Sequence, residues 1–509
     1  DTEPGGDDTD TEPGGDDTFG DTAADTDAPP VDTDESCGFK DPPWDWDVPG
    51  NRYAGAGTFT AIASALSCPG SDEIPAWSLE DMDGDGLPDL VVTDHCDVGG
   101  TGAVGEDYWL VFPNLGDGFA PTPVQWPVPG QAYPGPETFD LKANAQDCSF
   151  GASRPTYGLR DLDGDGRPDL VVTDPCAQPQ VGEDFWFVYF NHGAGFQSGP
   201  TQWALPGRAW AGDETFDALS KGLFCQGGTT TPAYELQDLD GDGDPDLVVT
   251  DDCALGVVGE SVWRVYRNAG TGFEAVTVDW AVPGALYDGR ETFDLVTSPL
   301  LCDGDNTRVA HGLRDLNGDG LLDLVVTDLC EVGGTGLIGE VAWDVHLNVG
   351  TGFDPNVRLW SVPGDRWAGN ESFDWFGEVQ NCQGGALQPS YTLADMDGDG
   401  REDFVILDAC DVGGRGAIGE TYWLYHRNDA AGFEPWPRQF ELPGAQYAGD
   451  ETFDGFSNPL DCSSGRARPR SEVLDLDGDG LLDLVIVDRC GESATGEVHW
   501  GYVPGTCAP

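Results

Sequence analysis

The stretch DMDGDGLPD, residues 81–89, decides the architecture because variants of it occur six times along the chain. The six copies begin at Asp81, Asp161, Asp238, Asp315, Asp395 and Asp475, so successive copies lie 77 or 80 residues apart. A period of this length is typical of a repeat architecture, in which each unit buries its apolar face against its neighbours. The sequence therefore predicts six structural units of one kind.

Each unit contains the patterns of four β-strands. The acidic stretch is followed by a short apolar run such as DLVVTD (169–174) and then by an aromatic run such as FWFVYF (185–190). A turn of the form N-x-G-x-G-F comes next, for example NHGAGF (191–196), because Asn and Gly supply the positive φ angles of hairpin turns. A strand ending in Trp-x-x-Pro-Gly and a Tyr-x-Leu strand complete the unit. Four-stranded antiparallel units repeated around an axis are propeller blades, so we predict an all-β fold.

The two ends of the chain each carry part of a unit. The sixth unit has an aromatic strand around residues 497–503 but no Trp-x-x-Pro-Gly strand, whereas Trp46 to Gly50 supplies an unassigned copy. The two parts add up to one blade, so we predict a six-bladed β-propeller over residues 37–509 that is closed by an N-terminal strand. An open array is the alternative, and it would need polar caps at two separate ends.

Twelve of the 14 cysteines follow the repeat, because two cysteines separated by 28 residues surround each acidic stretch. This constant spacing predicts six disulfides within units: Cys68–Cys96, Cys148–Cys176, Cys225–Cys253, Cys302–Cys330, Cys382–Cys410 and Cys462–Cys490. Cys37 precedes the N-terminal strand and Cys507 follows the last strand, so we expect them to pair and lock the ring. Zinc is the alternative for paired cysteines, but no C-x-x-C spacing occurs.

The D-x-D/N-G-D-G-x-x-D spacing is typical of a cation-binding loop. Carboxylates at positions 1, 3 and 5 converge on one point, Gly at position 6 allows a sharp turn, the carbonyl of position 7 faces inward and the acid at position 9 closes the shell. Oxygen ligands alone favour Ca²⁺ over zinc or copper, so we predict about six calcium ions. The predicted ligands are Asp81, Asp83, Asp85, Leu87, Asp89; Asp161, Asp163, Asp165, Arg167, Asp169; Asp238, Asp240, Asp242, Asp244, Asp246; Asp315, Asn317, Asp319, Leu321, Asp323; Asp395, Asp397, Asp399, Arg401, Asp403; and Asp475, Asp477, Asp479, Leu481, Asp483.

The acidic loop and the N-x-G-x-G-F turn together resemble the FG-GAP and VCBS-type propeller repeats of integrin α-subunit heads and many secreted bacterial proteins. The resemblance covers about residues 38–509. It implies that each loop binds Ca²⁺ between two strands of a blade, and that the protein serves structure and interaction without catalysis of its own. The units are longer than the usual repeat, six rather than seven are visible, and the cysteine pairs are unusual.

The charge of the chain excludes several partners. Asp and Glu number 93 against 23 Lys and Arg, which gives a formal charge of −70. Such a field repels phosphate backbones, so we expect no nucleic-acid partner, and anionic membrane surfaces are disfavoured for the same reason. No apolar stretch long enough to span a bilayer occurs in the sequence. The cysteines favour an oxidising, extracellular or cell-surface location, and we expect any signal peptide to have been removed.

Residues 1–36 form an acidic Pro/Gly-rich segment with 14 acidic residues, no basic ones and a tandem nonapeptide, DTEPGGDDT. Such a segment is expected to be disordered alone and to tether the propeller to a surface. A second hypothesis is that it docks on a neighbouring copy and builds a head-to-tail filament.

The sequence predicts a structural, adhesive or self-assembling protein whose partners are copies of itself, other extracellular proteins or glycans. No unit combines a His with a Ser or Cys nucleophile in a recognisable motif, so we predict no enzyme. The alternative is a carbohydrate-binding or carbohydrate-active surface protein, because paired carboxylates leave glycosidase chemistry open. The recurring Glu-Thr-Phe-Asp phrase, as at 137–140, either lines such a ligand face or is a structural loop whose Phe packs between blades.

Overall fold

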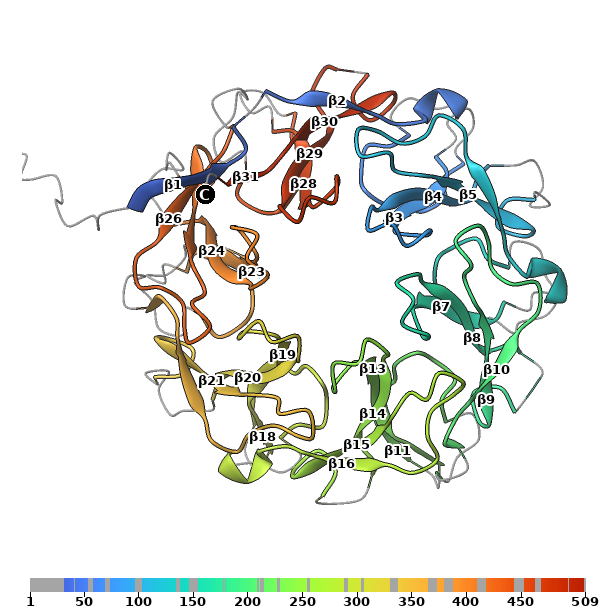
Figure 1. Cartoon of the computed structure of the whole chain (residues 1–509), viewed down its shortest axis with the longest axis vertical. Helices are drawn as coiled ribbons and strands as arrows, with labels where there is room; N and C mark the ends of the chain where they lie inside the picture. Colours follow the sequence, from blue (N-terminus) through green and yellow to red (C-terminus); the bar gives the residue numbers. More distant parts are fainter. Residues whose placement is uncertain are drawn as a thin grey trace, which may run out of the picture.

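The computed structural model contains six sheets of four or more strands arranged in a ring, which we number blade 1 to blade 6, and two further two-stranded sheets (Figure 1). The structure describes residues 32–40, 42–53, 58–68, 74–96, 103–133, 138–145, 154–176, 178, 180–207, 210, 215–226, 229–253, 257–287, 292–303, 306–329, 337–364, 373–379, 388–409, 418–443, 453–462, 468–492 and 494–507. This arrangement confirms the predicted six-bladed, all-β propeller.

Each blade is a four-stranded sheet whose strands follow one another from the inside of the ring to its rim (Figure 1). Blades 1 and 2 consist of β3 (Ala76–Glu80), β4 (Asp89–Asp94), β5 (Tyr108–Phe112), β6 (Val124–Pro127) and of β7 (Thr156–Arg160), β8 (Asp169–Asp174), β9 (Phe185–Tyr189), β10 (Thr201–Ala204). Blades 3 and 4 consist of β13 (Ala233–Gln237), β14 (Asp246–Asp251), β15 (Val262–Tyr266), β16 (Val278–Ala281) and of β19 (Ala310–Arg314), β20 (Asp323–Asp328), β21 (Ala342–His346), β22 (Arg358–Ser361). Blades 5 and 6 consist of β23 (Ser390–Ala394), β24 (Asp403–Asp408), β25 (Tyr422–His426), β26 (Arg438–Glu441) and of β28 (Arg470–Leu474), β29 (Asp483–Asp488), β30 (His499–Val503), β2 (Trp44–Asp47).

The remaining elements lie outside the four strands of each blade. They are β1 (Asp32–Gly38), β11 (Phe224–Gln226), β12 (Thr229–Thr231), β17 (Leu301–Asp303), β18 (Asn306–Arg308), β27 (Ser457–Asn458), β31 (Thr506–Cys507) and the 3₁₀ helices η1 (Gly50–Arg52), η2 (Gly130–Ala132) and η4 (Gly284–Leu286). Within the described residues, no helix has the length and apolarity that crossing a bilayer requires.

The core lies between successive blades. The second strand of each blade is buried over all or nearly all of its length, and β8 is buried throughout because both of its faces pack against neighbouring blades. Phe139, from the Glu-Thr-Phe-Asp phrase of the first unit, packs against Tyr157 of blade 2, and its carbonyl accepts a hydrogen bond from the Trp109 indole at 2.6 Å. The same Trp-to-Phe bond occurs in all six blades, so this phrase is a structural loop in which Phe packs between blades.

An N-terminal strand completes blade 6, as predicted. Strand β2 pairs antiparallel with β30 and places Trp46 directly opposite Trp500. The structure adds a strand that the sequence analysis did not predict, because β1 begins at Asp32, inside the segment assigned to the tail. Strand β1 runs parallel to β26 at the rim of blade 5 and antiparallel to β31, so the chain ends are held by two blades (Figure 1).

Candidate metal centres

Each acidic loop connects the first and second strands of a blade, and its backbone geometry follows from the sequence. In the first loop, Gly84 and Gly86 adopt φ angles of 78° and 88°, which favour glycine. Asp81 accepts hydrogen bonds from the backbone N–H groups of both glycines, at 2.8 and 2.9 Å. The loop is thus folded around its first carboxylate, and Asp83 and Asp85 project beside it.

Five of the six loops bring three carboxylate groups together within the described residues. The clusters, each with its three oxygen atoms within 4.8 Å of one another, are Asp81, Asp83, Asp85; Asp161, Asp163, Asp169; Asp238, Asp240, Asp242; Asp395, Asp397, Asp399; and Asp475, Asp477, Asp483. In the fourth loop Asn317 replaces a carboxylate, and its amide donates a hydrogen bond to Asp319 at 3.1 Å. The fourth loop therefore carries fewer carboxylate groups than any of the others.

The acid at position 9 is the buried member of each loop. Asp89 is 1% exposed, and its carboxylate accepts hydrogen bonds from the N–H groups of Met82 at 3.2 Å and Asn114 at 2.8 Å. Burial raises the pKa of the Asp89 carboxyl to about 7 despite these hydrogen bonds. The equivalent acids behave alike: burial raises the pKa to about 7 for Asp169, Asp246, Asp323 and Asp483 and to about 8 for Asp403.

Several buried carboxylate oxygens of the loops have no hydrogen-bond partner in the protein. They are Oδ1 of Asp161, Asp240 and Asp397 and Oδ2 of Asp246 and Asp323. A buried anionic oxygen without a partner is costly, and in a cluster of carboxylates the group that satisfies it is a cation. Carboxylate oxygens alone make a hard ligand set, so the residues present fit Ca²⁺.

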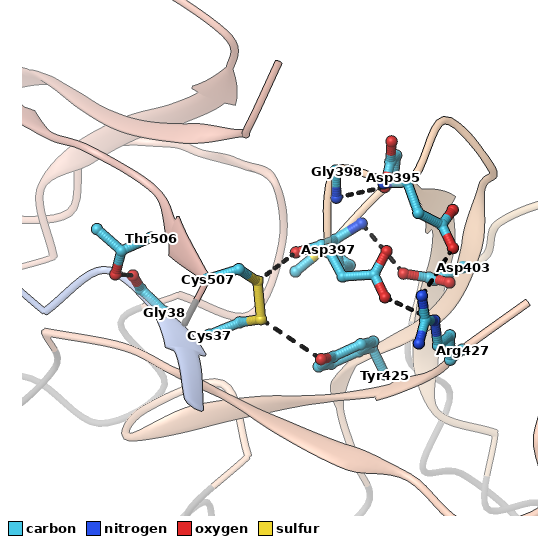
Figure 2. Close-up of a disulfide and its surroundings, with 12 residues drawn as sticks. Cys37, Gly38, Asp395, Asp397, Gly398, Asp403, Tyr425, Arg427, Thr506 and Cys507 are labelled. Atoms are coloured by element: carbon cyan, nitrogen blue, oxygen red, sulfur yellow. Dashed lines mark hydrogen bonds and ion pairs between the residues drawn. A yellow bond between two sulfur atoms is a disulfide. The ribbon is translucent and has the colours of Figure 1, made fainter. Parts of the chain in front are cut away.

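Arginine side chains divide the loops into two kinds, which the sequence analysis did not foresee. In loop 5 the guanidinium of Arg427 contacts Asp397 at 2.7 Å (Figure 2) and Asp399 at 3.1 Å. In loop 3 Arg267 contacts Asp240 at 2.9 Å. Both arginines immediately precede the Asn of the following turn, and this shared position is the signal that identifies them. Arg167 also pairs with Asp165 in loop 2, so an internal positive charge partly neutralises loops 2, 3 and 5 and lowers their attraction for an external cation.

In blades 1 to 5 the N-x-G-x-G-F turn, or its degenerate copy NDAAGF in blade 5, links the acidic loop to the loop of the preceding blade. The Asn191 amide of blade 2 donates to the Met82 carbonyl in loop 1 at 2.8 Å, while its backbone N–H donates to Asp169 of its own loop at 2.9 Å. The same amide-to-carbonyl bond, always at 2.8 Å, joins Asn114 to Leu476, Asn268 to Leu162, Asn348 to Leu239 and Asn428 to Leu316. A change in the conformation of one loop is therefore transmitted directly to a blade junction.

All of the predicted loop residues lie in these six loops, and three of the predicted disulfides are present in the described residues. These are Cys37–Cys507, Cys68–Cys96 and Cys462–Cys490. Cys176 and Cys253 are also disulfide-bonded. The side chains of Cys148, Cys225, Cys302, Cys330, Cys382 and Cys410 lie outside the described residues, as does most of the acidic tail.

No protein-family model and no curated protein matches the sequence. Among solved structures, the chain is similar to the Tc holotoxin pore of Photorhabdus luminescens (TM-score 0.40, 17% identity), covering 89% of this chain but only 15% of that one. It is also similar to an Agrocybe aegerita lectin that recognises terminal N-acetylglucosamine (TM-score 0.38, 17% identity, 86% and 81% covered) and to an α-L-arabinofuranosidase of Fusarium graminearum (0.29, 10%, 92% and 98%). These similarities are too low to bear on function, which has to be argued from the residues of this chain.

Proposed function

We propose that this protein is a calcium-stabilised extracellular propeller with a structural or adhesive role, of the FG-GAP or VCBS type. The observation that supports it is the set of partnerless buried carboxylate oxygens inside the acidic loops. Calcium supplies the missing positive charge when bound. The loop carboxylates hold it, and the hydrogen bonds of the Asn side chains connect the stabilised loops to the blade junctions.

The repetition of the loops supports a stabilising role for the metal. A catalytic metal requires a single site with an open coordination position and a shaped substrate cavity. Here the loops recur around one face and contact one another: a Cβ atom on Gly84 would lie 2.7 Å from the Arg167 side chain of the next loop. Closely spaced negative loops repel each other, so a cation bound in one loop also reduces the electrostatic repulsion between that loop and its neighbours.

Calcium titration tests the proposal. We expect close to six ions per chain by metal analysis, and a fall in the midpoint of thermal unfolding on chelation, because each site held at 100 times its Kd stabilises the fold by about 2.7 kcal/mol. The double variant Asp83→Asn/Asp85→Asn should lose about one ion per chain. Asp117→Asn, an exposed acid in the neighbouring turn, is the matched control and should lose none. Chelation that leaves both the midpoint and the metal content unchanged would refute the proposal.

Self-assembly through the acidic tail is the finer part of the proposal. Strand β1, which begins at Asp32, lies at the rim of blade 5 (Figure 1), and the acidic tail is the sequence that precedes it. The test is deletion of residues 1–31, which spares β1, followed by electron microscopy and sedimentation at saturating calcium. Assemblies that persist without the tail would contradict a docking role, and their loss with an intact monomer would support it.

A further inference from the structure

Among the five blade junctions whose copy of the Glu-Thr-Phe-Asp phrase ends in Asp, one departs from the others in the charge around that residue. In four units this Asp contacts a basic side chain: Asp140 with Arg154 at 3.2 Å, Asp217 with Lys221 at 2.6 Å, Asp294 with Arg308, and Asp454 with Arg468 at 3.0 Å. The equivalent Asp374, between blades 4 and 5, has no ion pair within the described residues.

The sequence at this junction explains the missing cation. Arg154, Arg308 and Arg468 each stand two residues before the first strand of their blade, and at this place blade 5 has Gln388. Glu378 faces the first strand at Tyr391, just as Lys221 faces it at Tyr234 in blade 3. The carboxyl groups of Asp374 and Glu378 are hydrogen-bonded to each other, and Gln388 donates to Glu378 at 2.7 Å. Among the described residues, the position that holds an acid and a base in four other units therefore holds two acids here without a basic side chain.

These two acids line a pocket of about 480 Å³. Its other walls are apolar or aromatic, and they come from Pro299, Leu300, Ala310, Trp375 and Val379. Val379 is 81% exposed at the mouth of the pocket, and Asp374 Oδ1 is buried without a hydrogen-bond partner. The corresponding pocket between blades 1 and 2 contains Lys142 and no acid, and the one between blades 3 and 4 contains both Lys221 and Glu235.

The electrostatics of the pair favour a positive ligand over a neutral one. Burial, the charge of Asp374 and the hydrogen bond to Asp374 together raise the pKa of Glu378 to about 7, and burial raises the pKa of Asp374. Two close carboxyl groups thus share a proton that a cation can replace. A tryptophan face beside carboxylates also attracts an ammonium or guanidinium group, while the apolar walls accommodate its carbon chain.

We propose that the pocket formed by Asp374, Glu378 and Trp375 binds a protonated amine or guanidinium carried on a short apolar chain, placing it where Arg154, Arg308 and Arg468 place theirs in other units. The same chemistry is available from a free alkylamine or from a lysine or arginine side chain of a partner protein. The inference does not depend on the calcium loops.

Isothermal titration calorimetry at saturating calcium and low ionic strength tests this proposal with three probes: n-butylamine, Nα-acetyl-lysine-N-methylamide and its Nε-acetylated form. We expect the two charged probes to bind and the neutral Nε-acetylated probe to bind at least about tenfold more weakly, because hydrogen bonds to charged groups are the strong ones. Tighter binding of the lysine derivative than of butylamine would assign the site to a protein side chain, and the reverse to a free amine.

Two variants make the test specific. Gln388→Arg restores the basic residue of the other units, so it should abolish binding while keeping or raising the midpoint of thermal unfolding; Gln125→Arg, on the exposed strand β6, is the charge-matched control. Glu378→Gln should weaken binding at least about tenfold without unfolding the chain. Charged probes that bind equally to all variants would show only attraction to the overall negative charge and would overturn the proposal. Absence of binding at millimolar probe, or binding of neutral sugars that survives Gln388→Arg, would overturn it as well.

Discussion

Four of the six blade junctions are joined by a continuous N-x-G-x-G-F turn and a fifth by the degenerate copy NDAAGF (428–433), whereas the junction between blades 5 and 6 is joined by a turn that two segments distant in the sequence share. Gly505 takes the place of the Asn, since its N–H donates to Asp483 at 3.0 Å as that of Asn191 does to Asp169. Gly38 and Phe39 take the place of the closing Gly-Phe, since the Phe39 N–H donates to Glu441 at 2.9 Å as that of Phe273 does to Ala204.

The Cys37–Cys507 disulfide stands where the continuous turns have a peptide bond (Figure 2). Thr506 pairs with Gly38, as Leu115 pairs with Gly118 in blade 1, so the two cysteines occupy adjacent positions in the middle of the turn. Their Cα atoms lie 4.1 Å apart, close to the ~3.8 Å across a trans peptide. The junction has no Asn amide, and Cys507 Sγ contacts the Met396 carbonyl at 3.4 Å instead. The comparison teaches that the geometry of the turn does not require a continuous peptide chain.

Among the variants that test this comparison, removal of the disulfide should cause the largest loss in the free energy of unfolding. The bond closes 470 residues, for which the chain-entropy model gives about 6 kcal/mol, against about 3–4 kcal/mol for the 28-residue loop of Cys68–Cys96. We expect Cys37→Ala/Cys507→Ala to lose more free energy of unfolding than the matched control Cys68→Ala/Cys96→Ala, measured by urea denaturation at saturating calcium. Equal losses would mean that β1 and β2 hold the ring without the bond.

Truncating the aromatic residue of the split turn should have the next largest effect. Phe39 is 2% exposed and packs edge-on against Trp423 at 5.9 Å, as Phe196 packs against Trp109 at 5.6 Å. Phe39→Ala and Phe196→Ala should therefore each cost about 3–5 kcal/mol in the same denaturation experiment. A cost below about 1 kcal/mol for Phe39→Ala alone would show that the N-terminal segment does not replace the turn.

Removing the Asn bridge should weaken a continuous junction by a smaller amount. Asn191→Ala loses the amide bonds to Met82 at 2.8 Å and Pro168 at 3.2 Å and leaves a buried carbonyl without its partner. We expect a loss of about 2–3 kcal/mol in the free energy of unfolding. The control is Gln125→Ala on an exposed strand, expected within about 0.5 kcal/mol of wild type. If Asn191→Ala loses no more free energy of unfolding than Gln125→Ala, the Asn hydrogen bonds do not stabilise the continuous junctions.

Much of this architecture could be predicted because the six units of the chain can be compared with one another, which identifies the positions that recur. The six acidic loops, the four strands of each blade and the closing role of Trp46 all follow from recurring spacings. The split turn was missed although its signal is present: Gly38-Phe39 precedes Trp46 by the same interval as Gly118-Phe119 precedes Trp126. Without its Asn and without a continuous chain, the motif is too short to recognise.

Contacts that depend on side-chain reach could not be predicted from spacing. Arg427 and Arg267 approach the acidic loops only because the hairpin folds the end of the third strand over the loop. The pair of Asp374 and Glu378 likewise depends on the register between residue 378 and Tyr391. Periodicity identifies the positions that recur, and these residues are the ones that differ between units.

The smallest effect should come from a hydrogen bond that belongs to the split turn alone. Thr506 Oγ1 donates to the Gly38 carbonyl at 3.0 Å, where the continuous turns have His, Leu, Ala, Val or Asp. Thr506→Val should cost about 1 kcal/mol in the disulfide-bonded protein. If the disulfide holds the two strands in the turn geometry, the same substitution should cost close to nothing in the Cys37→Ala/Cys507→Ala background, and the double-mutant cycle reports the difference. An undiminished cost in that background would mean that β1 and β31 keep their register without a covalent link, so that packing between blades 5 and 6 alone defines the turn.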